Sequence, residues 1–152
     1  MQNTTLKLFR SLLNLQFPDG PVISGDAVPG VLYPDFEERP LPSGTMRKAD
    51  VDLDGPDKDG HMWVESGGGT SLFDRPNVFK GKKWLSFEIP EGTPVPPPLL
   101  IQFTGHNKAL NANHYQIECR NMMRMDGFKG ALDNLARSAI ARSVELAKTI
   151  QG

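Results

Sequence analysis

The sequence predicts an α+β fold in which a mostly antiparallel sheet assembly packs against one long C-terminal helix. Fifteen glycines and thirteen prolines among 152 residues favour short strands joined by long loops over a helical bundle. Short apolar stretches with a period of two recur through the middle of the chain. Residues 128–150 instead carry apolar side chains spaced three and four apart, which is the pattern of a helix.

Length, charge and cysteine content restrict the class of protein. A chain of 152 residues is expected to form one domain over 1–152, large enough to bury a core without disulfides or metals. Seventeen basic against eighteen acidic residues give no bias toward nucleic acid or anionic membrane. The single cysteine, Cys119, excludes an intramolecular disulfide and fits a reducing compartment. We therefore expect a protein made in the cytoplasm.

No apolar run approaches the roughly 20 residues that would span a bilayer. The first residues also lack the basic and apolar regions of a signal peptide. If the protein is exported, we expect a route that needs no Sec signal, and we expect no contact with membranes.

The opening strand is predicted over residues 5–10. Leu6 and Leu8 share one face, and Arg10 falls at the far end of that same face because the period is two. Leu12, Leu13 and Leu15 can continue the chain as a short helical turn. An arginine at a strand end is most often a solvated surface charge, so Arg10 alone assigns no function.

Residues 18–60 form a loop-rich stretch of Pro, Gly and Asp without sustained periodicity. Such long irregular stretches tend to be functional or partly disordered. Within it, Asp50-Val51-Asp52-Leu53-Asp54-Gly55 matches the first half of a calcium-binding EF loop, but the twelfth position is His61, where a bidentate Glu is needed. The three histidines also lie too far apart for a local metal motif. We therefore expect a solvated acidic loop and no metal.

The central strands are predicted from alternation. Residues 85–89 form one strand, a proline-rich connector follows at 94–98, and residues 99–103 form a buried strand. Residues 113–119 place Tyr115, Ile117 and Cys119 on one face, and His114, Gln116 and Glu118 on the other. By default the first face belongs to the core, with Cys119 as an inert core thiol, and the second faces solvent.

The C-terminal helix is predicted to start at a capping residue, Asp126. Its apolar stripe is expected to contain Phe128, Leu132, Leu135, Ala136, Ala139, Ile140, Val144, Ala147 and Ile150.

The triple glycine at 67–69 runs directly into two hydroxyl residues, Thr70 and Ser71. A glycine run indicates a sharp bend or a close backbone approach, and the hydroxyls would point at whatever fills that space. The segment is neither a G-x-S-x-G nucleophile elbow nor a P-loop. A solvated loop before a strand is the plain alternative.

Taken in order, Arg10, Thr70 with Ser71, Lys108, and the face of His114, Gln116 and Glu118 resemble the site of ADP-ribosyltransferase-like toxins. The closer resemblance is to the type six secretion exported effector two family of bacterial cytotoxins. Five segments carry it: 5–10, 68–75, 89–97, 107–117 and 132–140.

The resemblance implies a split β-sheet with NAD bound in its cleft. Arg10 would hold the cofactor phosphate or ribose, and Thr70 and Ser71 would shape the nicotinamide end of the site, with Gly69 allowing close approach. His114 and Tyr115 match the late strand motif, and Lys108 lies in the loop before it. Gln116-Ile117-Glu118 resembles the Gln-x-Glu pair of some relatives, which makes Glu118 a candidate catalytic acid.

Elementary chemistry agrees with this assignment. An anionic dinucleotide favours the bidentate fork of Arg over Lys. Cleavage of the nicotinamide–ribose bond develops oxocarbenium character, which a nearby anion stabilises. We therefore expect an NAD-dependent cytotoxin, an ADP-ribosyltransferase or NAD glycohydrolase that acts in the cytosol of a target cell. Its expected partners are an unidentified target macromolecule and a cognate immunity protein. The alternative is a degenerate transferase fold that acts by binding, without turnover.

Overall fold

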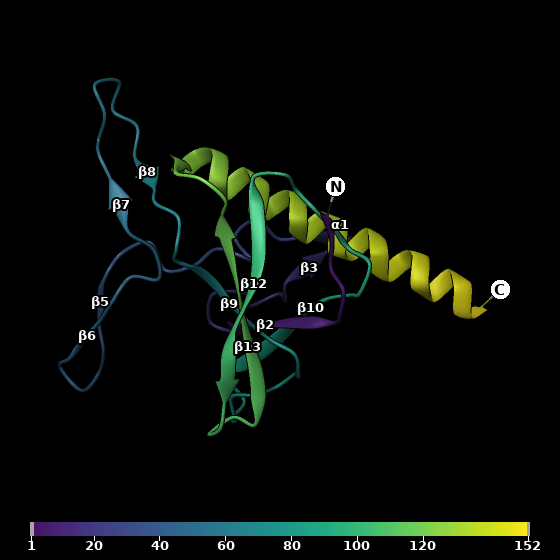
Figure 1. The fold of residues 1–152 in the computed structure, drawn as a ribbon. Helices are drawn as coiled ribbons and strands as arrows, with labels where there is room; N and C mark the ends of the chain where they lie inside the picture. Colours follow the sequence, from purple (N-terminus) through teal and green to yellow (C-terminus); the bar gives the residue numbers. More distant parts are fainter. Residues whose placement is uncertain (1, 152) are drawn as a thin grey trace.

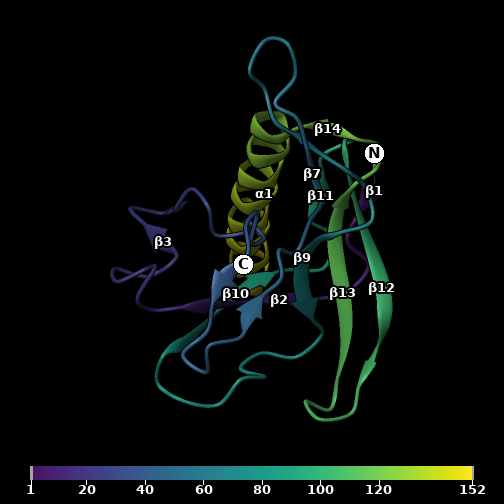
Figure 2. The ribbon, with the colours of Figure 1, turned by 90° about the vertical axis from the view of Figure 1, so that its left-hand side faces the viewer.

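The computed structural model describes residues 2–151, and its centre is a five-stranded antiparallel sheet (Figures 1 and 2). The strand order is β10-β2-β9-β13-β12. The strands are β2 (Leu8–Leu13), β9 (Gly69–Phe73), β10 (Trp84–Ile89), β12 (Leu99–Asn107) and β13 (Ala112–Cys119). One long helix, α1 (Met125–Gln151), packs beside the sheet in both views, which confirms the predicted α+β class.

The sheet is split between β2 and β9. Within the described residues these two strands share one paired position, Phe9 opposite Phe73. By contrast, β10 and β2 pair over six residues, and β13 and β9 over five. The sheet therefore consists of a β10–β2 ribbon and a β9–β13–β12 ribbon that diverge from a narrow junction, as the predicted split sheet requires.

The first strand of this sheet lies further along the chain than predicted. It covers Leu8–Leu13 rather than 5–10, and Leu12 and Leu13 belong to the strand rather than to a helical turn. They pair with Leu85 and Trp84 of β10, and Leu12 is buried, so sheet pairing and burial override the local pattern. Arg10 does share the face of buried Leu8, as alternation predicts.

Several two-residue strands complete the fold. β1 (Gln2–Asn3) pairs with β11 (Pro94–Val95), and β14 (Met123–Arg124) with β8 (Trp63–Val64), which also pairs with β7 (Leu53–Asp54). The loop-rich 18–60 stretch forms two small hairpins, β3 (Val22–Ile23) with β4 (Asp26–Ala27) and β5 (Arg39–Pro40) with β6 (Met46–Arg47). The β5–β6 and β7–β8 segments form two arms at one side of the molecule (Figure 1).

Helix α1 begins one residue before the predicted cap. The Asp126 carboxylate accepts a hydrogen bond from the N–H of Gly127 at 2.7 Å, which satisfies one free donor of the first turn. The first half of the expected stripe is buried: Phe128, Leu132, Leu135, Ala136 and Ala139. The stripe is wrong beyond Ile140, since Val144 is 48% and Ile150 86% exposed. The helix extends past the sheet there (Figure 1), so nothing in the described chain covers its apolar side.

Cys119 belongs to the core, as predicted. It is fully buried, its thiol donates to the carbonyl of Val64 at 3.7 Å, and burial raises the pKa of the thiol. Among residues 2–151 no helix is long and apolar enough to cross a membrane, and no group of three or more His, Cys, Asp or Glu side chains could hold a metal ion.

Candidate functional site

A pocket of about 330 Å³ opens beside the split in the sheet. Arg10 is part of its lining, because β2 carries this residue next to the junction with β9. The guanidinium reaches across the split: Nη1 donates to the carbonyl of Ser71 at 3.3 Å and Nη2 to the carbonyl of Tyr33 at 3.0 Å. Arg10 Nε is buried and has no hydrogen-bond partner within the described chain. Arg10 is therefore a partly buried cation that lines a polar pocket and is held in place by two backbone carbonyls.

Burial lowers the pKa of Arg10, and the nearby carboxylates of Asp50 and Asp35 counteract this by favouring the charged form. An arginine remains charged under such conditions because its pKa begins far above neutral pH. The pocket therefore contains a permanent positive charge that is only partly solvated, which suits an anionic ligand.

A second part of the pocket lining comes from residues 35–50, which include the β5–β6 hairpin. Asp35 Oδ2 accepts a hydrogen bond from Arg47 Nη1 at 2.5 Å and forms an ion pair with Arg39 Nε at 3.3 Å. Arg47 Nη2 also reaches Asp50 Oδ1 at 3.3 Å. All four charged side chains line the same pocket as Arg10, which gives three arginines against two aspartates.

An aromatic wall closes a further side of the pocket. Phe79 and Trp84 stack with their ring centroids 4.7 Å apart, and Phe73 meets Phe79 edge-on at 5.9 Å. The three rings line the pocket together with Ser71 and Ser11. A flat aromatic surface next to guanidinium groups can accommodate a ligand that combines heterocyclic rings with phosphates.

The two predicted hydroxyl residues lie on opposite faces of β9. The Ser71 side chain lines the pocket. Thr70 is fully buried, and its Oγ1 donates to the carbonyl of Leu32 at 2.6 Å. The expectation that both hydroxyls point at one ligand is wrong, because successive side chains of a strand point to opposite faces. Thr70 instead supports the pocket by fixing the segment that accepts the Arg10 hydrogen bond.

The same segment is also tied to helix α1. Tyr33 Oη donates to Asp133 Oδ2 at 2.8 Å, and the N–H of Gly30 donates to Asp133 Oδ1 at 3.0 Å. Burial and the Asp133 hydrogen bond raise the pKa of Tyr33 to about 12. Residues 30–33 are therefore held by hydrogen bonds to three elements: Asp133 of α1, Thr70 of β9 and Arg10 of β2.

The glycines at 68 and 69 allow other backbone segments of this protein to approach closely. A Cβ at Gly69 would lie 1.7 Å from the carbonyl oxygen of Ile117, and one at Gly68 would lie 2.3 Å from that of Asp50. Gly67 has φ of 102°, a value that L side chains rarely adopt. The expected close approach is therefore present, but the approaching group is backbone of this protein, and Gly69 does not line the Arg10 pocket.

The predicted Gln116–Glu118 pair shares one face of β13, as alternation requires. Gln116 Nε2 donates to Glu118 Oε2 at 2.9 Å, and Gln102 Nε2 donates to Glu118 Oε1 at 2.6 Å. Glu118 is 8% exposed and is not part of the lining of the Arg10 pocket. The structure thus brings the pair together but holds the acid between two amides, outside the pocket lining.

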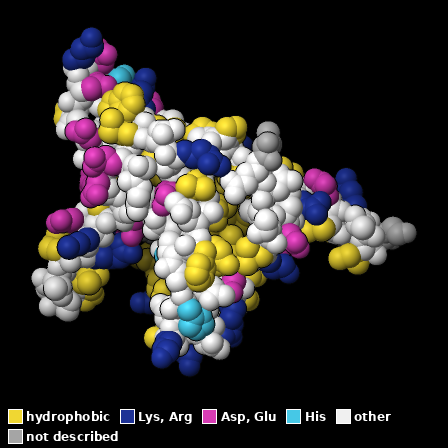
Figure 3. All heavy atoms as spheres, viewed as in Figure 1, with side chains coloured by type: hydrophobic (Ala, Val, Ile, Leu, Met, Phe, Trp, Pro, Cys, Tyr) yellow, Lys and Arg dark blue, Asp and Glu magenta, His cyan; other side chains and the backbone are white. Residues whose placement is uncertain are grey.

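The remaining predicted residues also lie outside this pocket. His114 contacts Thr104, stacks edge-on against Phe73 at 5.2 Å, and has a pKa lowered by burial. Lys108 is exposed in the turn of the β12–β13 hairpin. In Figure 3, Lys and Arg side chains gather around the tip of this hairpin, while Asp and Glu follow the β7–β8 arm.

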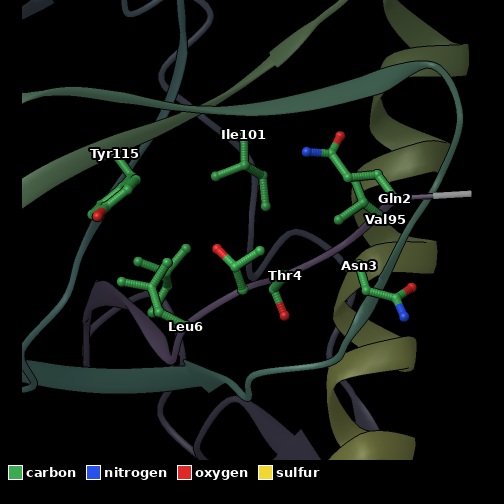
Figure 4. A pocket seen from close by; sticks show the side chains of 9 residues that line it. Gln2, Asn3, Thr4, Leu6, Val95, Ile101 and Tyr115 are labelled. Atoms are coloured by element: carbon green, nitrogen blue, oxygen red, sulfur yellow. The ribbon is translucent and has the colours of Figure 1, made fainter.

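Tyr115 lies on the opposite face of β13 from His114. It borders a separate cavity of about 60 Å³ with Thr4, Leu6 and Ile101, as Figure 4 shows. This small cavity cannot hold a dinucleotide, since ligand pockets measure roughly 300–1,000 Å³. Tyr115 and Arg10 therefore do not share a pocket.

Nine residues of the pocket lining were missed by the sequence interpretation: Asp35, Arg39, Arg47, Asp50, Ser11, Leu13, Phe73, Phe79 and Trp84. The signal that could have indicated the first four was the length of the irregular 18–60 stretch, because long structured loops are commonly functional. No local pattern places that stretch opposite β2.

Comparisons with known proteins agree with this architecture. The model of the Tse2 ADP-ribosyltransferase toxin family matches residues 8–144, which spans both ribbons of the sheet and most of α1. Toxin Tse2 of Pseudomonas aeruginosa strain PAO1 is 31% identical over 156 aligned positions, covering 97% of this chain and 96% of that protein. The fold and the match define a toxin of the ADP-ribosyltransferase class. The chain belongs to the Tse2 family of ADP-ribosyltransferase toxins.

This membership confirms the expected family, the cytotoxic function and the NAD-dependent ADP-ribosyltransferase activity. An enzyme of this class uses NAD as its substrate and has a target that receives the ADP-ribose.

Proposed function

We propose that the Arg10 pocket binds NAD and that the nicotinamide–ribose bond is cleaved there. The observation that carries the proposal is the position of Arg10 in the split of the sheet, where its guanidinium faces a pocket of about 330 Å³. Ser71 and the Phe79–Trp84 pair line that same pocket.

The chemistry of the lining suits each part of NAD. Guanidinium groups suit the pyrophosphate, because each can donate two parallel hydrogen bonds to an anion. The aromatic wall suits a heterocyclic base. The Ser71 hydroxyl can donate to or accept from a ribose hydroxyl or the nicotinamide amide.

The reaction needs charge stabilisation more than proton transfer. As the C1′–N bond breaks, its electron pair moves onto the nicotinamide nitrogen and neutralises the pyridinium. The ribose then carries the positive charge until the acceptor attacks C1′ and loses a proton. The Asp35 and Asp50 carboxylates are anions of the pocket that can favour this cationic ribose.

The other predicted site residues either hold the backbone around the Arg10 pocket in place or lie outside that pocket. Thr70 positions the 30–33 segment, and Gly69 allows β9 to approach β13. For Lys108 and His114 we propose contact with the target macromolecule. For buried Glu118 and for Tyr115, which borders the small cavity, we propose that they position strand β13.

Nicotinamide release from NAD by the purified protein, with extract of a target cell as the acceptor source, tests the proposal. We expect release by the wild type and a loss of at least about 10-fold in Arg10→Lys, since Lys keeps the charge but not the fork. Arg142→Lys is the matched control, because Arg142 lies on α1 and contacts Glu91 and Glu145. Absence of both NAD affinity and release in the wild type would favour the alternative, a toxin that acts by binding.

We further propose the cellular setting implied by the toxin class. The protein is exported by a type VI secretion system, acts in the cytosol of the target cell and is neutralised in its producer by a cognate immunity protein. Expression in the cytosol of a host without an immunity gene should stop growth. Normal growth of such a host with soluble, full-length protein would contradict this setting.

A further inference from the structure

We infer that Arg47 of β6 is a binding residue for the pyrophosphate of the dinucleotide, with Arg39 beside it. The inference rests on the proposed function of the Arg10 pocket and adds a second anion-binding element to it, supplied by the β5–β6 hairpin.

The first argument is that Arg10 is already engaged. Each of its terminal nitrogens donates to a backbone carbonyl, one in β9 and one at Tyr33. A phosphate bound bidentately by Arg10 alone would compete with the contacts that hold the 30–33 segment. A dinucleotide with two negative phosphates therefore needs further donors in the pocket.

Arg47 is the pocket residue best placed to supply them. Its side chain is 39% exposed, compared with the partly buried Arg10, and it lines the same pocket. Its two terminal nitrogens are held in place by the carboxylates of Asp35 and Asp50. A phosphate offers oxygen acceptors of the same kind, so the two terminal nitrogens that bind one oxygen each of Asp35 and Asp50 can instead bind two oxygens of a phosphate.

The charge balance also favours this assignment. Arg10, Arg39 and Arg47 face Asp35 and Asp50, which leaves one excess positive charge at the pocket before a ligand arrives. The Arg47–Asp35 pair is solvent-accessible, with the two side chains 39% and 33% exposed, and accessible ion pairs stabilise a fold only weakly. Arg47 can therefore exchange Asp35 for a doubly charged pyrophosphate at small cost.

Calorimetric titration of NAD into wild type and two variants tests the inference. Arg47→Ala should lower NAD affinity about 10- to 100-fold, the loss expected for one charge-assisted bidentate contact. Asp35→Asn should retain or raise NAD affinity, because it frees Arg47 and removes a competing anion. The Asp35 N–H, which donates to Asp50 Oδ2 at 2.7 Å, remains available in that variant.

The different changes in NAD affinity expected for Arg47→Ala and Asp35→Asn separate ligand binding by Arg47 from a structural role. If Arg47 acts only by holding Asp35 and the hairpin, both variants should lose affinity together, and the inference is overturned. Thermal unfolding of both variants should stay close to that of wild type, and Arg142→Ala serves as the control arginine. Equal NAD affinity of Arg47→Ala and wild type would also overturn the inference while leaving the proposed function intact. No binding by wild type would instead refute the proposed function itself, and the inference with it.

A phosphate-free fragment adds a second readout. Nicotinamide riboside lacks the pyrophosphate, so its affinity should be the same in wild type and Arg47→Ala, whereas that of ADP-ribose should fall as NAD affinity does. A fall for both fragments would show that Arg47 shapes the pocket as a whole and would contradict the inference.

Discussion

Arg10 and Thr70 donate hydrogen bonds to consecutive carbonyl groups of one buried segment. Thr70 Oγ1 binds the carbonyl of Leu32 at 2.6 Å, and Arg10 Nη2 binds that of Tyr33 at 3.0 Å. Two residues from different strands on either side of the split therefore hold the same stretch of backbone. This shared attachment fixes the backbone that leads into Asp35, a residue of the pocket lining.

Thr70→Val should destabilise the protein without changing the shape of the pocket. Valine keeps the volume of threonine but leaves the buried Leu32 carbonyl without its donor, which costs about 1–3 kcal/mol. Urea unfolding measures this change, and Thr70→Ser should recover most of it. Unchanged stability in Thr70→Val, combined with lost transferase activity, would contradict the structural role of Thr70.

Ser71→Ala should lower nicotinamide release while leaving the stability of the protein nearly unchanged. The Ser71 side chain lines the pocket, so its removal should change the free energy of unfolding by less than about 0.5 kcal/mol. Nicotinamide release should fall about 10-fold, as expected for one lost hydrogen bond to the substrate. Full activity of Ser71→Ala would exclude Ser71 as a substrate contact.

Gly69→Ala should be severely destabilising, by several kcal/mol. The new methyl group would lie 1.7 Å from the Ile117 carbonyl, so the β9–β13 pairing must shift. Gly130→Ala is the matched control: it lies on α1 with open space around the added carbon, and alanine should stabilise the helix by up to about 1 kcal/mol. A folded, stable Gly69→Ala protein would contradict the observed strand spacing.

The raised pKa of Tyr33 should make the free energy of unfolding depend on pH. Its pKa rises from 10.0 in the unfolded chain to about 12 in the fold, so the protonated hydroxyl is the stabilised form. The contribution is complete below pH 10 and is lost as the pH rises toward 12. Tyr33→Phe should be less stable than wild type at pH 8, and the difference between the two proteins should shrink from pH 10 to 12. A difference that stays constant over this window would show that Tyr33 ionises normally.

The sheet was predictable because its signals are local. The period of two placed Arg10 on the face of Leu8, and it placed Gln116 and Glu118 together on β13. The same rule would have separated Thr70 from Ser71 had they been assigned to a strand rather than to a loop. The sequence interpretation treated the glycine run and the two hydroxyl residues as a turn or loop, whereas Gly69 is the first residue of β9.

The far wall of the pocket was not predictable, because it depends on contacts between distant parts of the chain. Arg47 lines the same pocket as Arg10 but belongs to the 18–60 stretch, which has no periodicity from which its position could be predicted. The end of helix α1 was missed for a related reason. An apolar stripe predicts burial, but whether Val144 and Ile150 find a partner depends on how far the sheet extends.

The fluorescence of Trp84 tests the central claim most directly. The protein has two tryptophans, and Trp63 lies on β8 with its indole N–H on Asp57, outside the pocket. In Trp63→Phe the signal comes from Trp84 alone, which stacks on Phe79 in the pocket wall. We expect added NAD to change Trp84 emission in a saturable manner, with an apparent Kd that Arg10→Lys raises. Nicotinamide release by Trp63→Phe without any change in Trp84 emission would show that NAD binds elsewhere.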